Sequence, residues 1–245
     1  ELAYRKALWA MGQLPDEVAA RPEHRESFGK VHQNIGLLIG TRQLDEAEAS
    51  LRFARTTFTE LLSTSPDSPG LRHSLAAADS ALGNVLAARD RLEEAEPLFR
   101  ESLILRQELA RQFPTMSAVQ NTLAWFLATC PDSRFRDSDR AISAAERAVQ
   151  LDPRDGKFWN TVGVARYRAG HWKQAIDALN KSVELRGAAD AIDWFLLSMA
   201  NWQLDLKTEA QDFLAKGRGW MNDNKPHDEE LNRFRDEAEQ LLERD

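Results

Sequence analysis

Pairs of small residues that stand seven positions apart recur along this chain, and they constrain its fold more than any other feature. Each pair has an apolar residue between its members, so the three positions share one face over two turns of an α-helix. Small residues on such a face allow a second helix to approach closely. The pairs are Ala47/Ala54, Ala95/Ser102, Ala141/Ala148, Ala175/Ser182 and Ala210/Gly217.

A repeating helix-turn-helix unit follows from these pairs. Another small residue precedes four of them by eleven or twelve positions, with breaker or polar residues between. The pairs that begin at Ala141, Ala175 and Ala210 recur at about 34 residues, the period of the tetratricopeptide repeat. The best copy has Trp159 and Gly163 ahead of Ala175, in the order that this repeat requires. The preceding small residues are Gly36, Gly83, Gly163 and Ser198.

The chain is therefore predicted to be all-α, an α–α superhelix of about five helix-turn-helix units with a truncated N-terminal helix and a C-terminal capping helix. An irregular helical bundle is the alternative. We expect one solenoid domain over 1–245, made of a remnant helix of an upstream repeat at 1–12, longer repeats at 23–113, a repeat with an inserted turn loop at 117–153, two standard repeats at 156–222 and the capping helix at 227–245. The helices are expected at 1–12, 23–39, 44–63, 70–88, 92–112, 117–129, 138–150, 157–169, 173–185, 190–204, 207–222 and 227–243.

Composition removes several classes of function. The net charge of −7 argues against nucleic-acid binding, which needs a basic face. One cysteine rules out an internal disulfide framework, and no apolar run approaches the ~18 residues that membrane insertion requires. The histidines, His227 among them, are scattered and match no metal motif, and no nucleotide-binding loop occurs, so we expect no cofactor. A cytoplasmic location is the expectation.

The loop from Pro131 to Arg140 is the most charged turn between two repeat helices. Its charges either are solvated and pair locally or form an interaction loop; both readings stay open. Ser138 or Asp139 is expected to cap the helix that follows. Cys130, just before the loop, follows an apolar helix and is expected to be a buried small hydrophobe, since a nucleophile would need a positioned base.

The units resemble tetratricopeptide repeats, a family in which the first helix of each pair lines a concave groove. That resemblance implies a peptide-binding site in which amides bond a peptide backbone, rings cover its side chains and cations attract acidic groups. The alternative is that these aromatic residues simply pack between repeats. The implied groove residues are Asn84, Asn121, Trp125, Lys157, Asn160, Val164, Tyr167, Arg168, Ile192, Phe195, Met199, Trp202 and Gln203.

Four stretches carry a more specific resemblance: Leu127–Asp137, Ala148–Gly156, Trp159–Ala165 and Asp193–Trp202. They are similar to the C-terminal repeat array of large bacterial eukaryotic-like Ser/Thr protein kinases. The resemblance implies a kinase domain upstream of this sequence, which itself holds no Gly-rich loop, H-R-D or D-F-G motif.

The function expected is therefore that of a non-catalytic scaffold that binds a protein or peptide partner in a larger signalling protein. The alternative is a structural spacer or a self-association module, with self-association through the truncated N-terminal end. A groove filled by the loop at 131–136 or by the C-terminal helix would favour that alternative. An enzymatic function centred on Cys130 and a histidine is a third reading.

Overall fold

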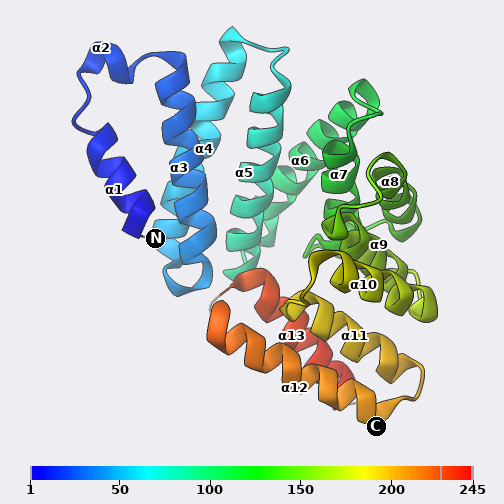
Figure 1. The fold of residues 1–245 in the computed structure, drawn as a ribbon. Helices are drawn as coiled ribbons and strands as arrows, with labels where there is room; N and C mark the ends of the chain where they lie inside the picture. The colour runs from blue at the N-terminus through cyan, green and yellow to red at the C-terminus, as the bar shows by residue number, and fades with distance from the viewer. Residues whose placement is uncertain (1, 227, 244–245) are drawn as a thin grey trace. The chain divides into compact units, whose positions relative to one another are not determined.

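The computed structural model describes residues 2–226 and 228–243, and it confirms the predicted all-α class (Figure 1). No strand occurs within these two ranges. The ends of the predicted capping helix at 227, 244 and 245, and with them His227, lie outside the described residues. The helices are α1 (Leu2–Met11), α2 (Asp16–Ala19), α3 (Pro22–Ile39), α4 (Leu44–Thr64), α5 (Pro69–Ala88), α6 (Leu92–Gln112), α7 (Ser117–Thr129), α8 (Ser138–Leu151), α9 (Gly156–Arg168), α10 (Trp172–Arg186), α11 (Ala191–Gln203), α12 (Lys207–Asn224) and α13 (Glu229–Leu242).

The chain divides into two compact units, Glu1–Leu109 and Ala110–Asp245. The boundary lies inside α6. The first unit contains the hairpins α3/α4 and α5/α6 together with α1 and α2, and the second contains the hairpins α7/α8, α9/α10 and α11/α12 together with α13. The expectation of one solenoid domain over 1–245 stays a prediction.

Glycine lets the two helices of a hairpin touch, as the spacing of small residues predicted. A Cβ on Gly163 of α9 would lie 2.6 Å from the Leu179 side chain of α10, and one on Gly36 would lie 2.5 Å from Leu51. Ser198 takes the glycine position in α11, and its hydroxyl donates to the carbonyl of Ala210 at 2.7 Å. In each of these hairpins the small residue thus lies where the two helices approach closely.

Aspartates cap four helices of the second unit, α8, α9, α11 and α13. Asp155 caps α9, and Asp190 with Asp193 forms a reciprocal capping box at the start of α11. At α8 the cap is Asp137, whose carboxylate accepts from the backbone N–H of Arg140. The expectation of Ser138 or Asp139 there is wrong, because the helix begins at Ser138 and its cap is the extended residue before it.

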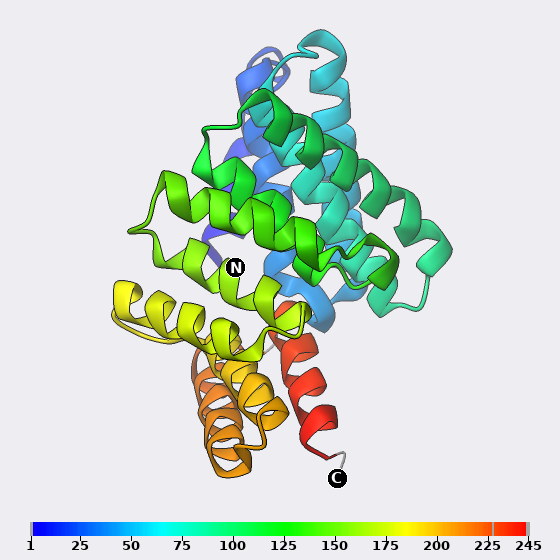
Figure 2. The ribbon, with the colours of Figure 1, turned by 90° about the vertical axis from the view of Figure 1, so that its right-hand side faces the viewer.

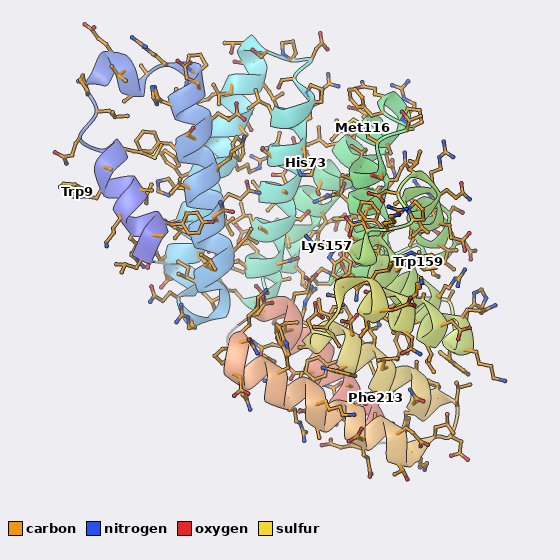
Figure 3. The ribbon with its side chains drawn as sticks, viewed as in Figure 1. Trp9, His73, Met116, Lys157, Trp159 and Phe213 are labelled. Carbon is orange, nitrogen blue, oxygen red and sulfur yellow. The ribbon has the colours of Figure 1, made fainter. Side chains whose placement is uncertain are left out.

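In the first unit, α1 is helical as predicted but buries none of its side chains. It packs against α3. Trp9 is 72% exposed and points away from the helices beside it (Figure 3). One buried cluster of this unit lies between α4 and α5 and contains Ala54, Phe58 and Leu75, and α3 and α6 also bury apolar residues such as Ile39 and Phe99.

In the second unit the first helices of the hairpins, α7, α9 and α11, pack in sequence against one another. Small residues fill the spaces around them: Ala124, Ala145 and Ala178 meet Val162 in one buried cluster. The last helix, α13, packs on α11 and α12 (Figure 2). It carries a buried apolar stripe of Leu231, Phe234 and Ala238, as an amphipathic capping helix requires.

Candidate functional site

The C-terminal helix α13 reaches beyond the last hairpin. It makes hydrogen bonds to α7 and α9, the first helices of the two preceding hairpins in the second unit. We call the surface of α7, α9 and α11 that meets α13 the inner face; its bonded residues are Trp125, Thr129 and Arg168. Trp125 and Arg168 are the two predicted groove residues whose side chains bond to α13.

Trp125 of α7 is the anchor at one end of the inner face. Its indole Nε1–H donates to Glu230 Oε1 of α13 at 3.0 Å. One turn later on each helix, Arg233 donates to the backbone carbonyl of Thr129, a long contact of 3.5 Å. Burial raises the pKa of the Glu230 carboxyl, and the charge of Arg233 and the Trp125 hydrogen bond act in the opposite direction.

Arg168 of α9 is the second anchor. Its guanidinium donates to both carboxylate oxygens of Glu237, with Nη2 to Oε2 at 2.8 Å. It also lies 5.7 Å from the centroid of the Phe234 ring and 5.6 Å from that of Tyr167. A paired charge with two aromatic neighbours is the arrangement by which an arginine recognises a specific acidic side chain.

Several predicted groove residues retain exposed surface. Lys157 is exposed, whereas Asn121, Ile192, Trp202 and Gln203 are half-buried. Asn121 Oδ1 is buried and has no hydrogen-bond partner in the described part of the chain. The Lys207 ammonium lies 4.7 Å from the centre of a Trp202 ring. Trp125 and Arg168 are also half-buried, and both contact α13.

Other predicted groove residues are structural. Val164, Phe195 and Met199 are fully buried and offer no surface to a ligand. Phe195 packs on Gly217 of α12, where an added Cβ would lie 2.5 Å from the ring. Asn160 is buried and donates through Nδ2 to Asp193 Oδ1 at 2.8 Å, which joins α9 to α11. For these four residues the structure replaces the expected ligand contact with packing or bonding inside the unit.

Tyr167 and Asn84 are the remaining predicted groove residues. Tyr167 is buried to 9% exposure, and burial raises its pKa to about 12, so the phenol stays neutral. Asn84 is half-buried on α5 and belongs to the first unit. The structure therefore gathers the predicted residues of α7, α9 and α11 in one unit, and Asn84 lies in the other.

A small cavity opens beside the Arg168–Glu237 pair. Its volume is ≈ 130 Å³, and its wall includes Cys130, Arg136 and Arg233 as well as that pair. Cys130 is buried, and burial raises its pKa to about 11, so its thiol is protonated at neutral pH. Such a thiol is a poor nucleophile.

The first unit holds a buried charged cluster of its own. Asp79 of α5 is fully buried, and its Oδ1 accepts from Arg55 Nε of α4 at 2.7 Å. Burial raises the pKa of Asp79 to about 7 and lowers that of Arg106, on α6, to about 10. Arg106 Nε donates to the hydroxyl of Ser102 at 3.2 Å. Arg106 Nη2 also donates to the hydroxyl of Ser80 on α5 at 3.2 Å, so the cluster joins α4, α5 and α6 and is a structural one.

Sequence reasoning missed the residues of α13 that meet the inner face: Glu230, Arg233 and Glu237. They recur at helical spacing on the face beside the apolar stripe. Acidic residues two turns apart around an arginine were the available signal, and it is a weak one because solvated helix faces carry the same pattern.

Comparisons with known proteins agree with this architecture. No family model and no curated protein matches the chain. A solved tetratricopeptide-repeat protein from Thermus thermophilus is similar over 85% of this chain and 99% of its own, at 17% identity and a TM-score of 0.53. PilW, a type IV pilus biogenesis factor, is similar over 94% of this chain and 90% of its own, at 19% identity and a TM-score of 0.52. The chain thus has the fold of a tetratricopeptide-repeat array.

Proposed function

We propose that this chain is a non-catalytic scaffold that binds protein or peptide partners on the inner face of its second unit. The observation that carries the proposal is that this surface already holds a polypeptide helix, α13. Trp125 and Arg168 contact it through specific side-chain bonds rather than through apolar packing alone. A surface that recognises one helix in this way has the chemistry to recognise another.

The contacts define the kind of partner. Glu230 and Glu237 of α13 lie two turns apart and meet Trp125 and Arg168. Phe234 stands between them and is buried. The proposed partner is therefore an amphipathic helix that presents two acidic residues seven positions apart with an aromatic residue between them. Lys157, which is exposed at the start of α9, adds a cation for further acidic groups.

The same observation favours a second candidate function, in which α13 closes the inner face permanently. The array would then be a structural spacer or a self-association module with no external peptide ligand. The two candidates differ in whether α13 leaves the inner face on the time scale of binding. That difference can be measured.

The experiment uses the full chain and a fluorescently labelled peptide with the sequence of residues 228–243. The double variant Glu230→Gln/Glu237→Gln weakens the attachment of the chain's own helix. The matched control, Glu184→Gln/Asp212→Asn, removes the same charge from pairs that lie within α10 and α12. For an open scaffold, the peptide binds the Glu230/Glu237 variant at least about tenfold more tightly than it binds wild type or control. Absence of binding to all three chains would support the spacer.

We also propose that this region recruits partners for a larger cytoplasmic signalling protein, such as a bacterial Ser/Thr kinase. The four stretches that resemble kinase-linked arrays support this part of the proposal. The gene sequence ahead of residue 1 tests it. A domain with the H-R-D and D-F-G motifs is expected there, and its absence would contradict the kinase context.

A further inference from the structure

The cavity beside the Arg168–Glu237 pair is lined by three arginines from three different segments of the second unit. Arg136 comes from the loop between α7 and α8, Arg168 from the end of α9, and Arg233 from α13. Glu237 is the one carboxylate among the described residues that form the wall. Three guanidinium groups against a single carboxylate leave an excess of about two positive charges, since arginine stays protonated in proteins.

Two of the arginines have hydrogen-bond donors without an acceptor among the described residues. The side chain of Arg136 forms no ion pair or hydrogen bond with any residue in the described ranges. Arg233 Nε is buried and has no hydrogen-bond partner there either. Its terminal nitrogens make only long contacts, 3.5 Å to the Thr129 carbonyl and 3.8 Å to Glu230. The buried Nε of Arg233 is costly to leave unpaired, so an acceptor in the cavity would stabilise it, and the exposed guanidinium of Arg136 is free to bind the same acceptor.

Neighbouring acids compensate these groups only in part: Glu230 lies 3.8 Å from Arg233, and the charge of Glu237 acts on Arg136. Asp132 pairs with Arg134, whose guanidinium donates to both of its carboxylate oxygens. Glu230 accepts from Trp125 and is not part of the cavity wall. Desolvation and then the charge of Arg168 lower the pKa of Arg136, and the charge of Glu237 offsets part of this shift.

We propose that this cavity binds a tetrahedral oxyanion, the phosphate group, through Arg136 and Arg233 with Arg168 at its edge. A phosphate group carries about −1.5 to −2 charge at neutral pH and three strongly accepting oxygens, which match the excess charge and the open donors. One water needs roughly 10–15 Å³ of such volume, so a cavity of ≈ 130 Å³ admits a group of several atoms. Arg136 is exposed, which leaves the cavity open to solvent.

The site depends on the docked C-terminal helix, because Arg233 and Glu237 both belong to α13. A ligand that binds only the docked form stabilises it by mass action. Phosphate is therefore expected to slow hydrogen exchange along α13. This inference does not rest on the proposed function, since the anion site requires no external helix.

The test measures the melting temperature of the full chain against inorganic phosphate and against chloride at equal ionic strength. Wild type is expected to gain stability with phosphate, and Arg136→Gln to weaken the apparent affinity by about tenfold or more. The control is Arg147→Gln, an exposed arginine of α8 that contacts Gln150. Arg136→Lys is expected to restore part of the response because the charge remains.

A second arm distinguishes the source of the phosphate group. A short glycine peptide with one phosphoserine is titrated alongside inorganic phosphate. Tighter binding of the peptide, abolished by Arg136→Gln, identifies a phosphorylated polypeptide as the ligand; equal or weaker binding identifies the free anion. Either result supports the site. The proposal would be overturned if phosphate and chloride gave the same stability, or if the Arg136→Gln and Arg147→Gln chains responded equally to phosphate. Neither result would change the outcome of the experiment with the labelled peptide of residues 228–243.

Discussion

Arg168 in the last turn of α9 holds both carboxylate oxygens of Glu237 on α13, a residue 69 positions further along the chain. This pair and the Trp125–Glu230 hydrogen bond attach the C-terminal helix to two hairpins that it does not follow in sequence. The inner face is therefore covered by the chain itself. The proposed partner site, the attachment of α13 and the proposed anion site all involve this one contact surface.

Replacing Glu237 by Gln removes the charge that faces Arg168. Because Glu237 keeps 37% of its side-chain surface exposed, solvent screens the pair, and we expect a loss of ~0.5–1 kcal/mol in the free energy of unfolding. Urea denaturation of the second unit measures it. Asp236→Asn is the control, since Asp236 pairs with Arg235 on the same helix. Equal effects of the two variants would show that the Arg168 contact contributes nothing.

Alanine substitutions at two glycines should change the stability in opposite directions, because Gly163 lies at the close approach of α9 and α10 and Gly219 does not. Gly163→Ala places a Cβ 2.6 Å from Leu179 Cγ, and overpacking of ~1–3 kcal/mol should exceed the helix-propensity gain. Gly219→Ala on α12 meets no atom within 4 Å, so it should stabilise the chain by ~0.5–1 kcal/mol. Thermal unfolding of both variants checks this. A stabilised Gly163→Ala chain would refute the close packing.

Asp79 predicts how stability changes with pH. Its pKa is raised from 3.8 to about 7 by burial, so the folded chain keeps a proton that the unfolded chain has lost. This contribution is present below about pH 4 and is lost as the pH rises to about 7, by on the order of 1 kcal/mol for each unit of pKa shift. Asp193, raised to about 6, acts in the same direction.

The variant Asp79→Asn isolates this effect. Burial lowers the pKa of His32, so the contribution of this residue to the stability of the folded chain is lost as the pH falls. That change would obscure the effect of Asp79 in the wild-type profile. The difference in unfolding free energy between wild type and variant removes that background. We expect the difference to change most between about pH 4 and pH 7. A difference that is constant across this range would mean that Asp79 is ionised in the folded chain throughout it.

Local patterns predicted most of the fold. The spacing of small residues indicated the hairpins, and the contact of Gly163 with Leu179 is the close approach that such spacing implies. Helix ends followed from proline, glycine and polar residues. The cap of α8 was misassigned by one or two positions because Asp137, Ser138 and Asp139 all have capping side chains.

The long-range contacts of α13 could not be predicted from local sequence patterns. Trp125 and Glu230 are 105 positions apart, and no helical periodicity relates them. The groove residues were projected onto an open face, whereas Phe195 turns toward Gly217 and Asn160 bonds to Asp193. Each of these depends on how a neighbouring helix is placed. The sequence pattern identifies which helices pair, and the structure is needed to find which side chains remain accessible.

Hydrogen exchange along α13 in the full chain tests the central claim most directly, because exchange reports how often this helix leaves the inner face. The account predicts that amides of residues 231–242 exchange far more slowly than in the isolated peptide, and that Trp125→Phe accelerates them while Trp159→Phe, whose indole bonds to the Pro153 carbonyl, does not. Exchange at the rate of the free peptide in the wild-type chain would contradict it.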